Sequence, residues 1–222
     1  MLEEIDFIMS VHTRTSRDYL ERVVEHDKAE CATIAKRFDK DFWDGARHHG
    51  YGGYRYDGRW LPVAQAMCDR YGIKAGDRIL DVGCGRGFLM YEFTVARPGV
   101  EVAGLDVSAY AIETAKEEVK GPIVEGHARK LPWPDDSFDF VVSLNTLHNL
   151  SIMDLFSAVR EIERVGRGAA KYIQVETYRN EQQKANLMNW QLTCECFYTP
   201  EEWRWIYEQC GYTGDYGFIV FD

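Results

Sequence analysis

From Arg78 onward, short apolar runs alternate with amphipathic runs, and this alternation constrains the fold more than any other feature of the chain. The apolar runs have the length of buried strands, whereas the amphipathic runs have the period of helices that cover a sheet. Strands joined through helices run parallel, because each crossover returns the chain to the same end of the sheet. The pattern therefore predicts an α/β fold with a doubly wound sheet.

The boundaries of the elements follow from apolar spacing and from helix start and stop signals. Strands are expected at residues 78–82, 101–106, 122–125, 138–143 and 170–176 and in the terminal run GFIVFD. Helices are expected at residues 87–96, 109–119, 152–165 and 200–210 and in the runs LPVAQAMCDRYG and NEQQKANLMNWQL. One or two further helices are expected between Thr15 and Phe38, with Ser16 as N-cap. We expect one structural domain, made of an N-terminal helical cap and lid (residues 1–60) and a binding domain (residues 61–222).

Composition excludes several classes of function. The apolar share of 45% suffices for a buried core, and the net charge of −10 disfavours nucleic acid as a partner, because an acidic surface repels phosphates. The N-terminal run has no signal-peptide pattern, and no apolar run is long enough to span a bilayer, so a cytoplasmic protein without a membrane partner is expected. The six cysteines form no C-x-x-C pair, which favours reduced thiols and no metal site.

The first strand ends in ILDVGCGRGFL, where Gly83, Gly85 and Gly87 permit a turn that passes close to a ligand at the start of a helix. A nucleotide-like cofactor is the natural expectation. The dinucleotide fingerprint G-x-G-x-x-G fails here, because Phe88 stands where its third glycine would be. Asp81 would repel a pyrophosphate but attract an ammonium group. The turn therefore favours a zwitterionic ligand over a diphosphate.

The run LDVGCGRG followed by GLDVS resembles the class I S-adenosylmethionine-dependent methyltransferases, in particular the small bacterial enzymes of the type 11 and type 25 groups. The likeness covers roughly residues 60 to 222. Two further elements match in order, EGHARKLPWPDDSFDFVVS and SLNTLHNL. The resemblance implies a Rossmann-like sheet of seven mostly parallel strands, S-adenosylmethionine as cofactor and S-adenosylhomocysteine as product.

The resemblance also implies which residues bind the cofactor. Asp106 is expected to accept both ribose hydroxyl protons, whereas His127 departs from the acidic or amide residue that the family usually has near the adenine. The remaining cofactor contacts are expected from the glycine-rich turn, from the neighbouring loops and from the lid: Asp81, Gly83, Cys84, Gly85, Gly87, Val107, Ala128, Arg129, Asn145, Tyr54 and Arg59.

Two side chains are candidate catalytic residues. His148 lies three positions after Asn145, so it is expected to face the methyl group and to take a proton from an incoming nucleophile. Glu176, at the end of the fifth strand, is a second candidate base. The alternatives are that His148 only shapes the wall and that Glu176 forms a salt bridge.

The substrate is expected to be a small molecule that is methylated on oxygen or nitrogen. The chain lacks both an N-P-P-Y type motif and a proline-cysteine nucleophile after its fourth strand. The gene context of similar enzymes suggests a sugar, a nucleotide-linked compound or a phosphorus-containing precursor of surface polysaccharide. The binding residues are expected in the aromatic, glycine-rich lid segment (residues 42–60), in the fourth-strand loop and in the insertion after residue 176: Tyr51, Trp60, His148, Asn149, Tyr178 and Trp190. Arg55 is an alternative to Arg59 for the cofactor carboxylate.

Two other functions remain open from the sequence alone. One is an NAD(P)-dependent oxidoreductase, and the other is a protein that binds S-adenosylmethionine without catalysis. The sequence gives no indication of the oligomeric state.

Overall fold

The computed structural model describes residues 2–8, 19 and 24–222. Residues 15–18 and 20–23 of the helical stretch that was expected from Thr15 to Phe38, including the N-cap Ser16, lie outside these residues. The described N-terminal helices are α3 (Lys28–Ala35) and α4 (Lys40–Asp44). Each begins at an aspartate, Asp27 or Asp39, whose side chain accepts a backbone N–H of the first turn.

The sheet confirms the doubly wound parallel architecture, but it has six strands in the described ranges where seven were expected. The strand order is β3-β2-β1-β4-β5-β6, and each pair of neighbouring strands is parallel. The strands are β1 (Arg78–Val82), β2 (Glu101–Asp106), β3 (Ile123–Glu125), β4 (Phe140–Leu144), β5 (Lys171–Glu176) and β6 (Asp215–Ile219). The order reverses between β1 and β4, which is where open α/β sheets bind ligands.

The helices follow the predicted order with one break. The later helices and short 3-10 turns are η1 (Arg47–His49), α5 (Leu61–Tyr71), α6 (Phe88–Ala96), α7 (Ala109–Glu113), α8 (Glu117–Lys120), η2 (Leu147–Asn149), α9 (Ile152–Val165), α10 (Glu181–Trp190) and α11 (Pro200–Gln209). The single helix expected at 109–119 is wrong, because the Lys116 N–H donates to the Arg86 carbonyl at 3.0 Å instead of continuing the helix. The chain therefore turns between α7 and α8.

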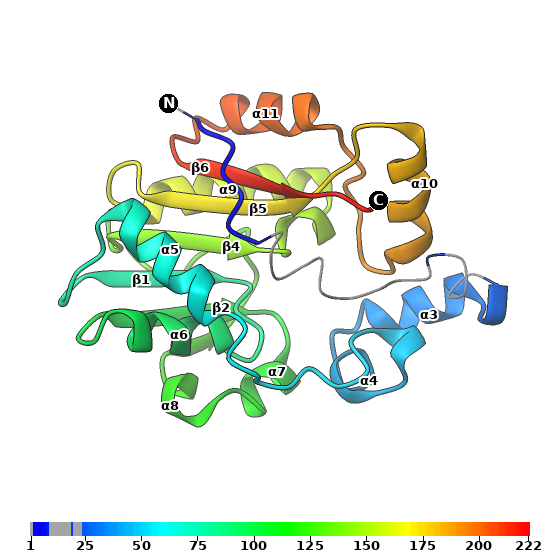
Figure 1. The fold of residues 1–222 in the computed structure, drawn as a ribbon, viewed down its shortest axis with the longest axis horizontal. Coiled ribbons are helices and arrows are strands. Elements are labelled where there is room, and N and C mark those ends of the chain that lie inside the picture. Colours follow the sequence, from blue (N-terminus) through cyan, green and yellow to red (C-terminus); the bar gives the residue numbers. More distant parts are fainter. Residues whose placement is uncertain (1, 9–18, 20–23) are drawn as a thin grey trace.

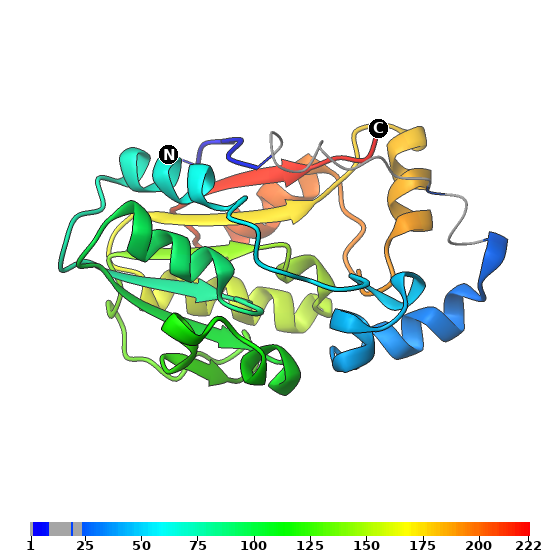
Figure 2. The same ribbon diagram turned by 60° about the horizontal axis from the view of Figure 1, so that its bottom comes forward.

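Helices cover both faces of the sheet (Figure 1). Helices α9 and α11 bury Val159, Ile162 and Trp203 against one face. Helices α5 and α6 bury Met67 and Phe93 against the other face. Helices α3, α4 and α10 lie beyond the carboxyl ends of the strands, as Figure 2 shows from a second side. No helix in the described ranges is long and apolar enough to cross a bilayer.

The free edge of β6 is covered by the start of the chain. The Ile5 N–H donates to the Tyr216 carbonyl at 2.8 Å, and the Tyr216 N–H donates to the Glu3 carbonyl at 3.0 Å. A parallel bridge at Glu4 thus lies where a seventh strand would continue the sheet. Gly217 permits this approach, because a Cβ there would lie 1.9 Å from the Tyr172 hydroxyl and 2.6 Å from the Ile5 carbonyl oxygen.

We predict that Gly217→Ala lowers the free energy of unfolding by about 1–3 kcal/mol, because the added methyl group overpacks a closed contact. Urea denaturation measures the change. The control is Gly121→Ala, whose added Cβ has no atom within 4 Å. Equal stabilities of the two variants would contradict the packing at this edge.

Candidate functional site

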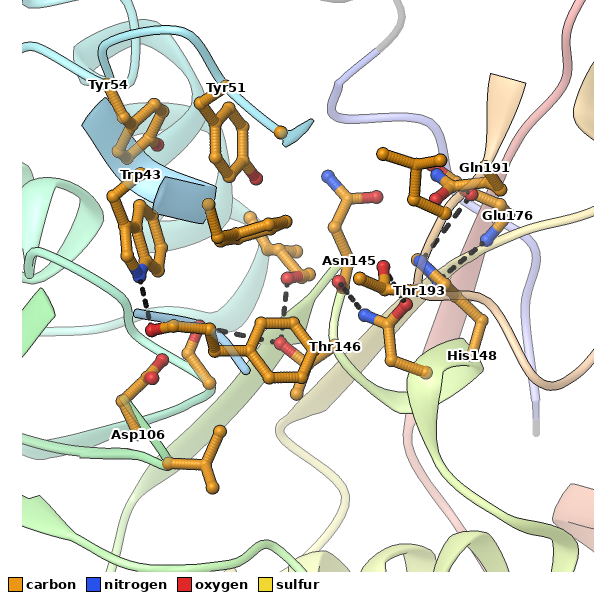
Figure 3. Close-up of a pocket in the computed structure, with 18 of the residues that line it drawn as sticks. Trp43, Tyr51, Tyr54, Asp106, Asn145, Thr146, His148, Glu176, Gln191 and Thr193 are labelled. Atoms are coloured by element: carbon orange, nitrogen blue, oxygen red, sulfur yellow. Dashed lines mark hydrogen bonds and ion pairs between the residues drawn. The ribbon is translucent and has the colours of Figure 1, made fainter. Parts of the chain in front are cut away.

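A cavity of about 790 Å³ opens at the carboxyl ends of the strands, at the β1–β4 switch point. Its walls come from the strand-end loops, the lid segment and the chain around α10 (Figure 3). One end, here called the glycine side, is formed by Gly83, Asp106, Val107, His127 and Ala128. The other end, here called the glutamate side, is formed by Asn145, His148, Asn149, Glu176, Trp190, Gln191 and Thr193.

The glycine-rich turn is tight enough to exclude side chains. Gly83 has φ +83°, and a Cβ there would lie 1.9 Å from the Thr146 hydroxyl. A Cβ at Gly85 would lie 2.8 Å from the Trp43 ring. Because both glycines are in contact with other segments, the turn joins the β4 loop to the lid segment.

Asp106 ends β2 and holds two loops together. One carboxylate oxygen accepts the Gly85 N–H at 2.7 Å, and the other accepts the Ser108 N–H at 2.8 Å. Burial raises the pKa of Asp106, and these backbone donors offset part of the increase. The two carboxylate oxygens offer about four acceptor positions between them, so Asp106 retains acceptor capacity for a ligand in the cavity.

Asp81 is a buried acid beneath the same turn. Its side chain is 3% exposed and accepts no hydrogen bond from the described part of the chain. Burial, and then the nearby charge of Asp106, raise the pKa of Asp81 to about 8. A cationic group beside Asp81 would favour its ionised form.

The lid segment is attached to the sheet by specific contacts. The Trp43 indole N–H donates to the Ser108 hydroxyl at 2.9 Å. Asp44 forms an ion pair with Arg86, and the Arg86 guanidinium also donates to the Tyr54 carbonyl at 2.6 Å. The ring centroids of Tyr54 and Phe88 lie 5.0 Å apart in a stacked arrangement. These contacts hold aromatic rings over the glycine side.

His148 and Glu176 form a buried pair on the glutamate side. The Glu176 N–H donates to Nδ1 of His148 at 3.4 Å, and Nε2 of His148 lies 3.5 Å from Oε2 of Glu176. The proton of the neutral ring therefore belongs on Nε2, where it faces the carboxylate. Gln191 also donates to this carboxylate. Burial lowers the pKa of His148 to about 3, so the ring stays neutral at pH 7.

Asn145 lies at the inner edge of the glutamate side, between the lid aromatics and the Glu176 cluster (Figure 3). Its backbone has φ +56°, a left-handed conformation that asparagine tolerates. Its side-chain oxygen is buried and accepts no hydrogen bond within the described part of the chain. Beneath it, Asn149 donates to the Asn145 backbone carbonyl at 3.2 Å and accepts the Thr193 hydroxyl at 2.8 Å.

Most of the residues expected from the sequence meet at this cavity. Those that line it are Gly83, Asp106, Val107, His127, Ala128, Asn145, Tyr54, Arg59, Tyr51, Trp60, His148, Asn149, Trp190 and Glu176. Those that do not line it are Asp81, Cys84, Gly85, Gly87, Arg129 and Tyr178. Arg129 instead lies 3.4 Å from Asp154, and the Tyr178 hydroxyl donates to the Phe197 carbonyl at 3.4 Å. The binding and catalytic roles of all twenty residues remain predictions.

Arg59 lies at the cavity but already has an anionic partner. Its guanidinium contacts both carboxylate oxygens of Asp57 at 2.5–2.9 Å. Arg55 also lines the cavity, and its side chain has no hydrogen bond or ion pair within the described ranges. Of the two arginines considered from the sequence, Arg55 is therefore the one with a guanidinium available to a ligand.

Sequence reasoning did not assign Trp43, Thr146, Gln191 or Thr193 to the site. The sequence carries a regional signal for Trp43, which belongs to the aromatic lid segment, and for Thr146, which belongs to the run SLNTLHNL. Gln191 and Thr193 belong to the insertion after residue 176, which was expected to cover the cavity. Their individual positions depend on how that insertion folds back on the sheet.

Comparisons with known proteins indicate a methyltransferase domain in this chain. Residues 80–173 match the family model described as a methyltransferase domain. A 27-O-demethylrifamycin SV methyltransferase of Amycolatopsis mediterranei is 33% identical over 139 residues, which cover 56% of this chain and 48% of that protein. A demethylmenaquinone methyltransferase of Tropheryma whipplei is 31% identical over 153 residues, which cover 65% of this chain and 60% of that protein.

Solved structures share the fold. A SAM-dependent methyltransferase from Archaeoglobus fulgidus matches with a TM-score of 0.56 at 22% identity, over 72% of this chain and 70% of that one. This likeness concerns the fold alone. The chain spans 33% to 60% of the length of the first curated relatives that it matches.

We predict that Asp81→Asn stabilises the ligand-free protein increasingly as the pH rises from 5 to 8. The folded wild type keeps the Asp81 proton up to a pKa of about 8, whereas the unfolded chain releases it near 3.8, so wild-type stability falls across this window. The advantage of the variant should grow by at most about 1.4 kcal/mol per pH unit. Thermal and urea unfolding at several pH values measure it. Glu208→Gln, which removes an exposed charge, is the control, and a pH-independent difference for Asp81→Asn would contradict the burial of a protonated acid.

We predict that the His148 ring does not titrate between pH 5.5 and 8 and carries its proton on Nε2. Its folded pKa of about 3 lies below the unfolded value of 6.5, so its contribution to stability is complete above pH 6.5 and is lost as the pH falls toward 3. Long-range ¹⁵N–¹H NMR spectra of the imidazoles report both properties. A titration midpoint near 6.5, or a proton on Nδ1, would show that the pair with Glu176 is wrong.

Proposed function

Because this chain contains a domain of the class I, S-adenosylmethionine-dependent methyltransferases, we propose that it transfers a methyl group from S-adenosylmethionine to a small molecule. The observation that carries the proposal is a single cavity with a glycine side suited to the cofactor and a glutamate side suited to an acceptor. Its volume of about 790 Å³ falls within the range of about 300–1,000 Å³ for small-molecule sites.

The residues on the glycine side fit this cofactor. Gly83 provides a close approach that a Cβ would fill, and Asp106 has acceptor capacity left for the ribose hydroxyls. Asp81 does not itself line the cavity, but it is a buried acid beneath the glycine-rich turn without a hydrogen-bond partner in the described chain, which suits an ammonium group close to the turn. Arg55 is an available cation for the carboxylate. When bound, the cofactor supplies an electrophilic methyl group and a neutral leaving group.

The side chains of the protein then bind, orient and exclude water. The lid segment covers the glycine side with Trp43 and Tyr54, which reduces the access of water. Glu176 contributes a carboxylate to the wall of the cavity, and in this proposal that carboxylate takes the proton that the acceptor loses. In this proposal His148 is a positioning residue, because both of its ring nitrogens face Glu176.

The acceptor is proposed to be a small molecule. Two relatives are named for the methylation of demethylrifamycin and demethylmenaquinone, which supports this class without identifying the compound. Aromatic and aliphatic side chains line the cavity as well as polar ones, including Phe42, Tyr51, Trp190 and Leu192. Such a lining suits a partly apolar acceptor. A sugar-containing precursor of surface polysaccharide remains compatible with it.

We predict that the protein binds S-adenosylhomocysteine in a calorimetric titration and that Asp106→Asn weakens this binding at least tenfold. Asparagine keeps one acceptor oxygen but loses the charge and the second acceptor, so it cannot hold both backbone amides and the ribose. The matched control is Glu208→Gln, which removes a carboxylate outside the cavity.

NADH serves as the competing ligand in the same experiment. A rise in melting temperature with S-adenosylmethionine and none with NADH supports the methyltransferase proposal. The opposite pattern would favour an oxidoreductase, and unaltered affinity in Asp106→Asn would remove Asp106 from the cofactor site. A protein that binds the cofactor but methylates no compound in a broad metabolite screen would be a non-catalytic binding protein.

A further inference from the structure

Arg86 stands in the middle of the glycine-rich turn, but it does not line the cavity. The preceding residue, Gly85, donates its N–H to Asp106 at 2.7 Å. The Arg86 carbonyl accepts the Lys116 N–H at 3.0 Å, so the backbone of the turn is fixed on both sides of this residue. The residue is buried, with 7% of its surface exposed. Because a buried guanidinium keeps its charge and requires partners, those partners indicate what the side chain does.

Every hydrogen bond that the Arg86 side chain makes within the described residues goes to the lid segment. The guanidinium forms an ion pair with Asp44, donates to the Tyr54 carbonyl at 2.6 Å and lies 5.8 Å from the centroid of the Trp43 ring. The hydrogen bond from Arg86 lowers the pKa of Asp44, although burial opposes it, so both groups are charged at neutral pH. The Nε–H of Arg86 is buried without an acceptor in the described chain. Such a buried donor is rare where a side chain serves packing alone.

These contacts close a loop within the lid segment. Arg86 holds the Asp44 carboxylate and the Tyr54 carbonyl at one point, and residues 45–53 lie between them in the sequence. Tyr51 belongs to this run, lines the cavity and projects from the lid toward it (Figure 3). The position of Tyr51 over the cavity therefore depends on a guanidinium that the glycine-rich turn supplies.

A guanidinium in this turn would also suit the carboxylate of a cofactor. The geometry favours the lid instead, because the two terminal nitrogens of Arg86 contact Asp44 and the Tyr54 carbonyl. Neither Arg86 nor Asp44 lines the cavity, whereas Arg55 does. Any effect of this ion pair on a ligand is therefore transmitted through the lid segment.

From these contacts, and resting on the proposed function, we propose that Arg86 is a positioning residue that holds the lid segment over the bound cofactor and limits the rate at which the cofactor leaves. The glycine-rich turn forms one wall of the cofactor site, and the lid segment forms the opposite wall. The ion pair with Asp44 joins these two walls outside the cavity. Release of the cofactor then requires the lid segment to move away from the turn, which breaks the contacts of Arg86.

The test measures the release of S-adenosylhomocysteine and the hydrogen exchange of residues 42–60. Arg86→Met keeps the length of the side chain but removes the guanidinium, and Asp44→Ala removes its anionic partner. Each should raise the dissociation rate of S-adenosylhomocysteine, measured by surface plasmon resonance, at least fivefold. Each should also reduce at least fivefold the protection that this ligand gives to the amides of the lid segment. Because both changes break one contact, the double variant should release the ligand no more than twofold faster than the faster single variant.

The matched control is Arg97→Met. Arg97 also pairs with an aspartate, Asp69, and donates to a backbone carbonyl, that of Ala96, at 2.8 Å. None of these three residues lines the cavity. The control should change the dissociation rate and the lid protection less than twofold. Equal effects of Arg97→Met and Arg86→Met would overturn the inference, because any lost arginine would then have the same consequence.

Asp44→Ala also distinguishes the positioning role from a direct contact with the cofactor. If the guanidinium bound the cofactor carboxylate, removal of Asp44 would leave it without a competing anion and would tighten binding. Tighter or unaltered binding of S-adenosylhomocysteine by folded Asp44→Ala would therefore contradict the positioning role. Folding is checked by circular dichroism and thermal unfolding of the ligand-free variants, and if Arg86→Met does not fold, Asp44→Ala decides alone.

Failure of the wild type to bind S-adenosylhomocysteine would overturn the proposed function, and it would leave the contact between Arg86 and the lid to be tested in the ligand-free protein. There, Arg86→Met should speed the hydrogen exchange of residues 42–60 at least fivefold, whereas Arg97→Met should not. Equal exchange in the two variants would show that Arg86 does not hold the lid segment.

Discussion

The carboxylate of Asp106 is the interaction on which the cavity depends. It accepts backbone protons from the glycine-rich turn and from the loop after β2, so one side chain sets the distance between two loops. Ser108, whose N–H is held in this way, in turn accepts the Trp43 indole proton and thereby attaches the lid segment. The sheet, the turn and the lid therefore meet at one buried acid, and a ligand that hydrogen-bonds to Asp106 contacts a point that all three share.

This arrangement places two acids, Asp81 and Asp106, under one turn, which is unfavourable for the protein alone. Burial raises the pKa of both, and the charge of Asp106 raises that of Asp81 further. The two buried acids therefore lower the stability of the ligand-free protein at a position that suits a cationic ligand. Binding sites commonly carry such a cost in stability. The glutamate side has a comparable cost in the unsatisfied oxygen of Asn145. A ligand would therefore stabilise groups at both ends of the cavity: buried acids at the glycine side and an unsatisfied amide oxygen at the glutamate side.

Sequence reasoning predicted the sheet and the glycine side, because both rest on short-range patterns. The strand ends and the glycine-rich turn are local in the chain, and the position of Asp106 after β2 follows from the length of one β–α–β unit. The break after α7 was missed, because it depends on a hydrogen bond from Lys116 to Arg86, thirty residues away in the sequence. A seventh strand was expected from the resemblance to the methyltransferase family. In the described ranges, the edge of β6 is bordered instead by one parallel bridge between Glu4 and Tyr216.

The glutamate side was predicted only in part. The sequence pointed to His148 and Glu176 separately, but their pairing requires the register of β5 against the loop after β4. Gln191 reaches Glu176 only because α10 folds back over the strand ends, which no local pattern encodes. Arg59 was assigned to a ligand, although Asp57, two residues earlier, satisfies it. Long-range contacts and local ion pairs thus decide which of the predicted side chains can still bind a ligand.

We propose that one cavity holds the cofactor and the acceptor in adjacent positions, the cofactor on the glycine side and the acceptor on the glutamate side. A crystal structure of the protein with S-adenosylhomocysteine would reveal this arrangement. We expect the ribose hydroxyls to contact Asp106 and the sulfur atom to face the glutamate side. A sulfur atom directed away from Glu176, or a lid aromatic ring between the sulfur and the glutamate side, would show that the two ligands do not occupy the cavity in this way.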